Sequence, residues 1–353
     1  MTLKPVLFFL LLFISYAAVA QHPDLTERID SLIQKQRPRA LNGIVMIARE
    51  GKPIYSAVHG VSDVAQQKAL QARDQFIIGS LSKQITAVLL LQEVDQGRLS
   101  LQDTLNTYLP DLKATWADSV TIHHLLNHSS GIVSLDKPLA FIPGSQFTYS
   151  PLIGYELLAS VLEKTSGETY ADLAEQLFAH CGMENTTVPL LYDKRSQAHQ
   201  NLVHSYTEEE EGVLVQEKYA LQDIAFATPS GAIIATAQDL TRWNACLHQG
   251  KLLKEASYQA MTTASVVRAG HRWGDLGYGY GLQINEQNGS IEYSHSGALV
   301  GFIATSLYYP ADNLSVIVLE NVAPNFEDMS RAFFFHDQIR SIVQAELVVN
   351  RHE

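Results

Sequence analysis

The most informative stretch of this sequence is Phe76-Ile77-Ile78-Gly79-Ser80-Leu81-Ser82-Lys83. Ser80 and Lys83 stand three positions apart at the start of a helix predicted over 82–96, so their side chains share one face. A serine hydroxyl becomes a useful nucleophile when a base lies within hydrogen-bond reach, and a desolvated lysine can supply that base. The alternative is a capping serine beside a solvated lysine. The almost wholly apolar helix after Lys83 favours the chemical interpretation.

Strand patterns occur at both ends of the chain around this stretch. Two β-type runs, 43–48 and 53–58, flank a hairpin signal at Glu50-Gly51-Lys52. Further strands are predicted near the C-terminus at 278–284, 290–294, 302–309 and 315–320. Helices are predicted over 24–36, 155–163, 170–180, 238–247 and 326–343. The expected fold class is therefore α+β, an α/β sandwich with an antiparallel sheet built from both chain ends, flanking helices and a mainly helical insertion.

The first twenty residues are predicted to be a signal peptide. Lys4 precedes an unbroken apolar run over 6–14, and Ala18-Val19-Ala20 is a small-x-small cleavage pattern. That run is short for crossing a hydrocarbon core of ~30 Å. The mature chain should begin near Gln21, be periplasmic or secreted, and carry no stable membrane span.

The rest of the chain, 21–353, is expected to form a single domain. A sheet subdomain should comprise about 21–80 and 275–353, and a helical subdomain about 81–274. The sequence shows no internal repeat and no low-complexity linker that would divide it further.

Composition excludes several classes of protein. The 353 residues are 46% apolar and 18% charged, which is typical of a globular chain rather than a disordered one. The net charge is 25 − 37 = −12, which argues against a nucleic-acid partner because such a surface must supply Lys and Arg. A small-molecule or peptide substrate is the expected partner, and the oligomeric state is left open.

Two local patterns have competing interpretations. Cys181 and Cys246 could pair in an oxidising compartment, but each sits in an apolar helical pattern, so we expect two unpaired structural thiols. The run Glu208–Glu211 could bind a cation, but like charges repel and favour water, so a solvated hairpin tip is expected.

Two further chemical signals lie far from Ser80 in the sequence. Tyr149, in Phe147-Thr148-Tyr149-Ser150-Pro151, could relay a proton if its hydroxyl reached Ser80, whereas an isolated tyrosine is usually a core residue. His295, in Tyr293-Ser294-His295-Ser296-Gly297, ends a predicted strand where glycine lets a substrate lie close. A structural histidine at a strand end is the alternative there.

Taken in order, these motifs resemble the serine β-lactamase and penicillin-binding-protein superfamily. The resembling branch contains class C β-lactamases, D-alanyl-D-alanine carboxypeptidases, D-aminopeptidases and related esterases. The resemblance runs from about Asn42 to Val343. Besides the motifs above, it includes the stretches 120–132, 230–240 and 278–282.

The resemblance implies a role for each motif residue. Ser80 would be the acylated nucleophile, and Lys83 and Tyr149 would share its proton and return it to the leaving group. His295, Ser296 and Gly297 would stand in place of the superfamily's Lys-Thr-Gly motif. The backbone N–H groups of Ser80 and Ala298 would form the oxyanion hole. No cofactor and no metal are implied.

Two departures from the superfamily pattern bear on the substrate. Pro151 stands where the Tyr-x-Asn motif has an asparagine, so the amide that contacts a substrate amide is absent. His295 is less reliably cationic than lysine, which predicts a weaker grip on a substrate carboxylate. These departures argue against efficient β-lactam hydrolysis and leave ester or small-peptide hydrolysis open. With the ordered motifs, the expected function is an exported serine hydrolase that forms an acyl-Ser80 intermediate on an ester, amide or D-amino-acid peptide bond. A true β-lactamase or D-alanyl-D-alanine carboxypeptidase is the alternative enzyme, and a non-catalytic peptidoglycan- or peptide-binding protein is the alternative of another class.

A pair of histidines has the spacing of a zinc site. His124 and His128 are four positions apart on a predicted helix. No glutamate follows His124 and no third ligand is evident, so no metal site is expected.

Overall fold

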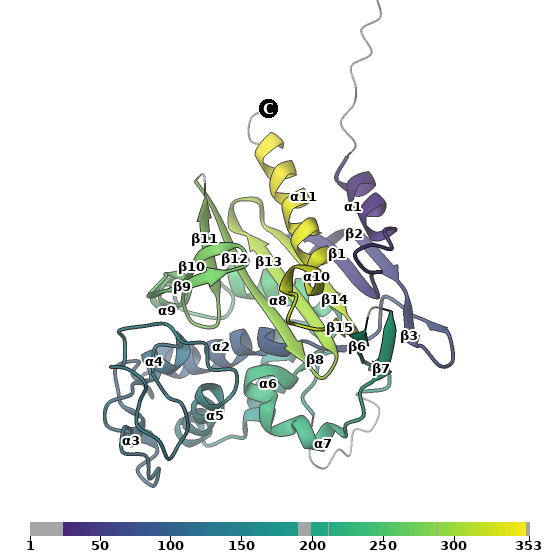
Figure 1. The fold of residues 1–353 in the computed structure, drawn as a ribbon. Helices are drawn as coiled ribbons and strands as arrows, with labels where there is room; N and C mark the ends of the chain where they lie inside the picture. Colours follow the sequence, from purple (N-terminus) through teal and green to yellow (C-terminus); the bar gives the residue numbers. More distant parts are fainter. Residues whose placement is uncertain (1–23, 190–198, 211, 288, 351–353) are drawn as a thin grey trace, which may run out of the picture.

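The computed structural model describes residues 24–189, 199–210, 212–287 and 289–350 (Figure 1). The predicted signal peptide, 1–20, lies outside the described residues. Within the described ranges no helix has both the length and the apolar character needed to cross a membrane.

An eight-stranded antiparallel sheet forms the centre of the molecule, in the order β2-β1-β14-β13-β12-β11-β10-β9. The first strands of the chain pair with the last: β1 aligns with β14 from Gly43 opposite Glu320 to Arg49 opposite Leu314. The expected fold class, with a sheet built from both chain ends, is therefore confirmed. The strands are β1 Gly43–Arg49, β2 Lys52–His59, β9 Val266–His271, β10 Gly274–Tyr278, β11 Gln283–Gln287, β12 Ser290–Leu299, β13 Phe302–Tyr309 and β14 Leu314–Glu320.

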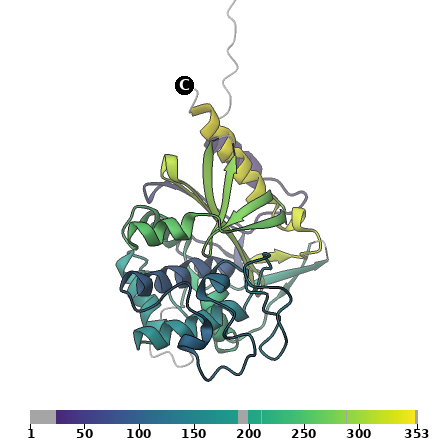
Figure 2. The same ribbon diagram turned by 90° about the vertical axis from the view of Figure 1, so that its left-hand side faces the viewer.

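Helices cover both faces of the sheet (Figures 1 and 2). On one face α1, Leu25–Ile33, and α11, Phe334–Asn350, pack against Val45 and Ile47 of β1. On the other face α2, Ser82–Asp95, and the layer around it pack against Ile44 and Met46. Side chains of a strand alternate between its faces, so a strand covered on both sides needs apolar residues at every position. The sequence of β1, GIVMIAR, meets that requirement.

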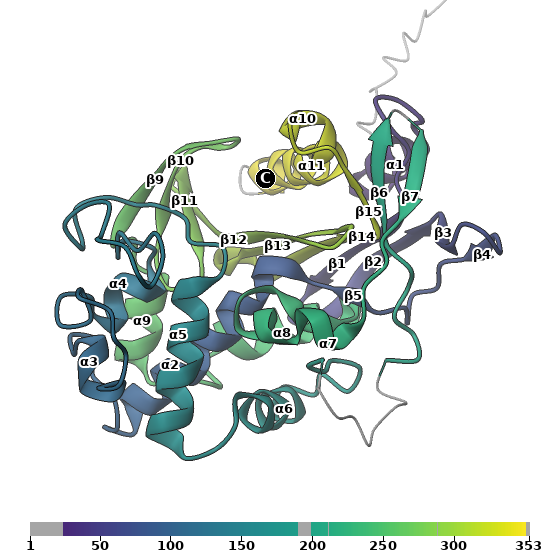
Figure 3. The same ribbon diagram turned by 60° about the horizontal axis from the view of Figure 1, so that its bottom comes forward.

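The helical layer lies below the sheet in Figure 3 and is organised around α2. Eleven of its fourteen residues are buried, as its nearly continuous apolar sequence predicts. Thr236 caps α8 by accepting a hydrogen bond from the Asp239 N–H at 3.1 Å. The other helices are α3 Leu105–Tyr108, α4 Ile122–Leu126, α5 Ile153–Ser166, α6 Tyr170–His180, α7 Leu221–Ile224, α8 Ala237–His248, α9 Glu255–Thr262 and α10 Met329–Ala332. The short strands are β3 Val61–Asp63, β4 Lys68–Ala69, β5 Phe76–Ile77, β6 Tyr206–Glu210, β7 Val213–Gln216, β8 Ile234–Ala235 and β15 Val322–Pro324.

Several elements differ from the sequence predictions. The single strand predicted over 278–284 is wrong, because β10 ends at Tyr278 and β11 begins at Gln283. Gly281 between them has φ +65°, a conformation that glycine adopts at little cost. Strand β9 was not predicted. The predicted C-terminal helix is divided into α10 and α11 at Phe333.

The expectation of two unpaired cysteines is also wrong. Cys181, directly after α6, is disulfide-bonded to Cys246 of α8, with the two Cα atoms 5.6 Å apart. Cys246 occupies an apolar position within α8 as predicted, whereas Cys181 lies one residue beyond the end of α6. The disulfide joins this helix end to α8. The two cysteines are 65 residues apart in the sequence, so no local pattern could predict that they lie close together.

The glutamate run lies in the predicted hairpin, but it is not wholly solvated. Strand β6, which contains Glu208 and Glu210, pairs antiparallel with β7. Glu208 is buried and accepts two hydrogen bonds from the guanidinium of Arg331, at 2.7 and 2.8 Å. Glu210 is exposed, and Glu211 lies outside the described residues. The run therefore begins with a structural ion pair.

Candidate active site

Ser80 lies at the junction between the helical layer and the sheet. It occupies a 3₁₀ turn, Gly79–Leu81, that leads directly into α2. Strand β12 approaches this turn so closely that a Cβ added to Gly297 would lie 2.1 Å from the carbonyl oxygen of Ile78. Gly79 has φ +55°, and a Cβ there would lie 2.3 Å from the Ala298 nitrogen. The two glycines are thus required for β12 to lie beside Ser80.

Two side chains meet at the Ser80 hydroxyl, one from the adjoining start of α2 and one from a distant loop. The Tyr149 hydroxyl donates to Ser80 Oγ at 2.6 Å. The Lys83 ammonium donates to the same oxygen at 3.1 Å. Tyr149 is contributed by the loop before α5, whereas Ser80 and Lys83 share the start of α2. The three residues proposed from sequence as nucleophile and proton carriers therefore lie together.

Lys83 is fully buried and has no carboxylate partner among the described residues. Its ammonium also donates to the carbonyl oxygens of Pro151 at 3.0 Å and Ser230 at 2.8 Å. With Ser80 Oγ, these acceptors match the three protons of an ammonium. The proline in place of the asparagine removes a side-chain amide, but its backbone carbonyl still holds the lysine. Ser230 is in turn held by a hydrogen bond from its hydroxyl to Glu156 at 2.6 Å.

The ring of His128 packs against the ring of Tyr149. Its ring centroid lies 4.5 Å from that of Tyr149, and its Nδ1 accepts a hydrogen bond from the Ser150 N–H at 3.2 Å. Burial, followed by the charge of Lys83, holds the pKa of His128 well below its ordinary value, so the ring is neutral. The placement of His128 on a helix with His124 is wrong. Helix α4 ends at Leu126, and His128 follows it with φ +60°.

His295 lies beside the site, but both of its ring nitrogens are engaged within the protein. Nδ1 lies 2.7 Å from the carbonyl oxygen of Ser296, which can only accept, so Nδ1 carries the proton. Nε2 therefore accepts from the Tyr278 hydroxyl at 2.9 Å. Burial, followed by the charge of Lys83, holds the pKa of His295 well below its ordinary value. A neutral, internally bonded ring cannot supply the cation that a lysine would bring to this position.

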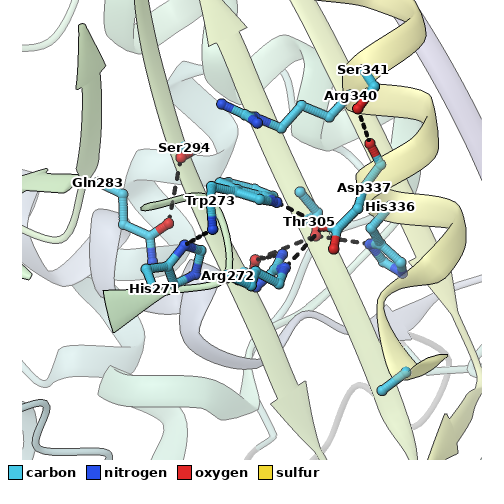
Figure 4. A network of polar contacts seen from close by, with 12 residues as sticks. His271, Arg272, Trp273, Gln283, Ser294, Thr305, His336, Asp337, Arg340 and Ser341 are labelled. Carbon is cyan, nitrogen blue, oxygen red and sulfur yellow. Dashed lines mark hydrogen bonds and ion pairs between the residues drawn. The ribbon is translucent and has the colours of Figure 1, made fainter. Parts of the chain in front are cut away.

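The other predicted residues of the motif have distinct surroundings. The Ser296 hydroxyl accepts a hydrogen bond from the Arg272 guanidinium at 2.8 Å and lies 3.4 Å from Thr305 Oγ1. Arg272 also donates to Asp337 of α11 at 2.9 Å, and Figure 4 shows these side chains between the β9–β10 turn and α11. Ala298 is exposed, one residue beyond the Gly297 contact with the Ser80 turn.

A cavity of about 290 Å³ opens above Ser80. One part of its wall is polar and formed by β9 and the turn after it, with Arg268, His271 and Arg272. Another part is apolar, with Phe326, Met329 and Phe333. The sequence analysis missed all six residues. None of the six belongs to a recognisable sequence motif, and an isolated arginine in a sequence does not show that it lines a cavity.

The described residues hold no group of three or more His, Cys, Asp or Glu side chains that could bind a metal ion. The groups present at Ser80 are its own hydroxyl, the amine of Lys83, the phenol of Tyr149 and backbone N–H groups. Such a set suits attack on a carbonyl carbon with proton transfer between neighbouring side chains.

Comparisons with known proteins agree with this geometry. The chain is 27% identical to penicillin-binding protein 4* of Bacillus subtilis (strain 168) over 313 residues, which cover 79% of this chain and 68% of that protein. It is 29% identical to esterase EstB of Burkholderia gladioli over 194 residues, 44% of this chain and 49% of the esterase. The structure of the D-amino acid amidase from Ochrobactrum anthropi SV3, in complex with L-phenylalanine amide, superposes with a TM-score of 0.77 at 18% identity, over 94% of this chain and 100% of the amidase.

The family comparison covers most of the chain. The profile of the Beta-lactamase family matches residues 29–339, which span the sheet and the helical layer and include every motif at the site. The chain belongs to the Beta-lactamase family.

Proposed function

We propose that this protein is a serine hydrolase that forms a covalent acyl intermediate on Ser80. The observation that carries the proposal is the convergence of the Tyr149 hydroxyl and the Lys83 ammonium on Ser80 Oγ, at 2.6 and 3.1 Å. The ammonium of this buried lysine contacts hydroxyl and carbonyl oxygens, and no carboxylate among the described residues lies within ion-pair distance of it. We therefore assign Lys83 the role of proton carrier.

The proposed reaction has two halves. The first half requires the Lys83–Tyr149 pair with one proton fewer, either as an amine beside the phenol or as an ammonium beside the phenolate. Ser80 Oγ then attacks the substrate carbonyl carbon while its proton passes to this pair. The bond to the leaving group then breaks, and the pair returns the proton to the departing oxygen or nitrogen.

In the second half, water attacks the acyl-Ser80 ester and gives a proton to the pair. The bond between the acyl carbon and Ser80 Oγ breaks, the pair returns the proton to Ser80 Oγ, and the acid is released. The N–H groups of Ser80 and Ala298 would stabilise the oxyanion in both halves.

We propose an ester, amide or D-amino-acid peptide bond as the substrate bond. The relatives named as an esterase and a D-amino acid amidase support this range. The absence of an asparagine side chain at Pro151 removes one partner for a substrate amide, which favours substrates that do not need that contact.

An active-site label tests the nucleophile directly. A fluorophosphonate probe should label the wild-type protein, and Ser80→Ala should abolish the label. Ser160→Ala, which removes an exposed hydroxyl on α5, is the matched control and should label normally. Undiminished labelling of Ser80→Ala would overturn the assignment.

Turnover separates the alternative functions. A short p-nitrophenyl ester should be hydrolysed faster than a chromogenic cephalosporin. A cephalosporin rate far above the ester rate would indicate a true β-lactamase. Binding of a peptidoglycan fragment with neither acylation nor hydrolysis would indicate a non-catalytic binding protein.

We also propose that the protein is exported. The cleavage pattern at Ala18-Val19-Ala20 supports this, as does the Cys181–Cys246 disulfide, because such bonds persist in oxidising compartments. Intact-mass measurement of the protein from the periplasm or medium should give a chain that begins near Gln21. An uncleaved chain retained in the cytoplasm would contradict export.

A further inference from the structure

We propose that Glu156 is a positioning residue whose negative charge, connected to Lys83 through Ser230, sets the pH at which the Lys83–Tyr149 pair gives up its proton. The inference rests on the proposed function, because it concerns the regulation of the same proton carriers. Glu156 belongs to none of the motifs by which the active site was identified, and it does not line the Ser80 cavity.

Two hydrogen bonds connect Glu156 to the lysine. The Lys83 ammonium donates to the Ser230 carbonyl oxygen at 2.8 Å, and the Ser230 hydroxyl donates to Glu156 Oε1 at 2.6 Å. Ser230 belongs to a fully buried turn, Thr228–Ala232, whereas Glu156 lies on α5 and Lys83 on α2. One residue of this turn therefore contacts the carboxyl with its side chain and the ammonium with its backbone.

Two observations indicate that Glu156 is ionised. The 2.6 Å separation between Ser230 Oγ and Glu156 Oε1 lies in the range for a hydroxyl that donates to a carboxylate, about 2.5–2.7 Å. Glu156 also lies in the first turn of α5, where the helix dipole favours a negative charge. Burial raises the pKa of Glu156, and the Ser230 hydroxyl and the charge of Lys83 offset part of that rise.

The second carboxylate oxygen has no donor. Glu156 Oε2 is buried, and within the described part of the chain it has no hydrogen-bond partner. A buried carboxylate with a single hydrogen bond is only partly compensated for its lost hydration, so the positive charge beyond Ser230 stabilises it. The interaction is mutual, and the carboxylate stabilises the ammonium of Lys83 to the same extent.

The other titratable groups around this cluster are neutral or positive. Burial lowers the pKa of three histidines and raises the pKa of three tyrosines, so these side chains are uncharged near neutral pH: His128, His271, His295, Tyr155, Tyr170 and Tyr278. Arg268 is positive, and its guanidinium carbon lies 5.1 Å from the ring centroid of Tyr149. Among the described residues that line the Ser80 cavity there is no aspartate or glutamate. Glu156 is therefore the group placed to hold a proton on the pair.

Loss of the Glu156 charge should make the pair easier to deprotonate. The pair must lose one proton before Ser80 can attack, and a nearby negative charge favours the protonated state of either member. Glu156→Gln removes the charge but keeps an oxygen that can accept from the Ser230 hydroxyl. The acid limb of the acylation rate should therefore move to lower pH.

The pH dependence of labelling by the fluorophosphonate probe tests this expectation. The pH of half-maximal rate should lie about one pH unit lower in Glu156→Gln than in the wild type, so labelling on the acid limb should be roughly tenfold faster. The plateau rate should change by less than about threefold, because the hydrogen bond to Ser230 is kept. Ser230→Ala keeps the carbonyl that holds Lys83 but removes the donor to Glu156. It should give a smaller shift in the same direction, and it carries the test if Glu156→Gln does not fold.

Glu184→Gln is the matched control, because Glu184 is exposed and does not line the cavity. Its half-maximal pH should equal that of the wild type. A Glu156→Gln rate that is lower at every pH with an unchanged half-maximal pH would show that Glu156 only supports the packing of α5. That result, or a shift to higher pH, would overturn the proposal.

Lysine NMR separates this proposal from the proposed function. In Ser80→Ala protein that is isotopically labelled at lysine Cε, the resonance that disappears in Lys83→Met identifies Lys83. This resonance should titrate at lower pH when Glu156→Gln is added. If the difference is seen but the wild type takes up no fluorophosphonate, the serine hydrolase assignment fails while the charge coupling stands. If the probe labels Ser80 but neither the resonance nor the rate profile moves, the role of Glu156 fails alone.

Discussion

Lys83 and Arg39 are both buried cations, but their partners differ in kind. The Arg39 guanidinium donates two hydrogen bonds of 2.6 Å to the carboxylate of Glu320, which also lies 3.0 Å from His336 Nε2. Lys83 has carbonyl and hydroxyl oxygens around it and no carboxylate among the described residues. A bidentate ion pair fixes the charge state of both partners, whereas neutral dipoles let a lysine exchange its proton. The Arg39–Glu320 ion pair therefore stabilises the sheet, whereas the surroundings of Lys83 are compatible with its proposed role in proton transfer.

The largest expected effect separates activity from stability at Lys83. Lys83→Met should lower the rate of Ser80 acylation by about 10³- to 10⁴-fold, because it removes the proposed proton carrier. The free energy of unfolding should change by less than about 2 kcal/mol, since the lost bonds are to neutral acceptors. Stopped-flow labelling and urea denaturation measure the two quantities. The control is Lys164→Met on the exposed face of α5, and a Lys83→Met protein that acylates normally would remove the lysine from the mechanism.

The opposite pattern is expected at the structural cation. Glu320→Gln leaves the buried Arg39 without its anion and should lower the free energy of unfolding by about 3–5 kcal/mol. The folded fraction should still acylate at close to the wild-type rate, because Glu320 does not line the cavity. Denaturant unfolding followed by probe labelling distinguishes the effects. A large loss of labelling in fully folded Glu320→Gln would mean that the two sites are coupled.

A smaller effect is expected at Tyr149. Tyr149→Phe keeps the ring that stacks with Arg268 and His128 but removes the hydroxyl that donates to Ser80. The acylation rate should fall by about 10²-fold, the lower range for a proton-transfer group. Tyr55→Phe, whose hydroxyl donates to Asp30 far from the site, serves as the comparison. An unchanged rate in Tyr149→Phe would leave Lys83 as the sole proton carrier.

The last prediction concerns how the free energy of unfolding of the wild type and of Glu320→Gln depends on pH. Burial alone would raise the pKa of Glu320, but Arg39 and His336 outweigh it and lower that pKa from 4.5 to about 2. A carboxyl with a depressed pKa stabilises the fold above its unfolded pKa and loses that contribution as the pH falls through its folded pKa. The stability difference between wild type and Glu320→Gln should therefore be constant above pH 4.5 and narrow toward pH 2. Urea denaturation at several pH values measures the difference, and a gap that widens on acidification would reverse this account.

Much of the fold was predictable because its signals are local. Local sequence patterns predict the strand β1 and the helix α2 from their apolar runs. They also predict the start of α8 from the capping side chain of Thr236. The errors occurred where contacts between distant segments determine the structure. Gly279 interrupts an otherwise strand-like sequence because a Cβ there would lie 2.1 Å from the Met261 carbonyl oxygen. Cys181 and Cys246 meet only because their helices pack together.

The site was predictable in part for the same reason. Ser80, Lys83 and Tyr149 belong to motifs with fixed local spacing, and they lie together in the structure. The environment of His295 was not predictable, because its neutral state depends on burial and on the Tyr278 hydroxyl from a neighbouring part of the sheet. Arg268 gave no sequence signal at all. Motifs point to the proposed reacting groups, whereas the charge of the surrounding cavity wall depends on which strands the fold places beside them.

The close approach of Gly297 to the Ser80 turn has a consequence for the order of assembly. Ser80, the proposed nucleophile, is synthesised well before β12, whose backbone forms the opposite side of its pocket. A nascent polypeptide that stops before this strand possesses the serine, the lysine and the tyrosine without an enclosed cavity. Synthesis must therefore pass β12 before a substrate can be held against the Ser80 hydroxyl.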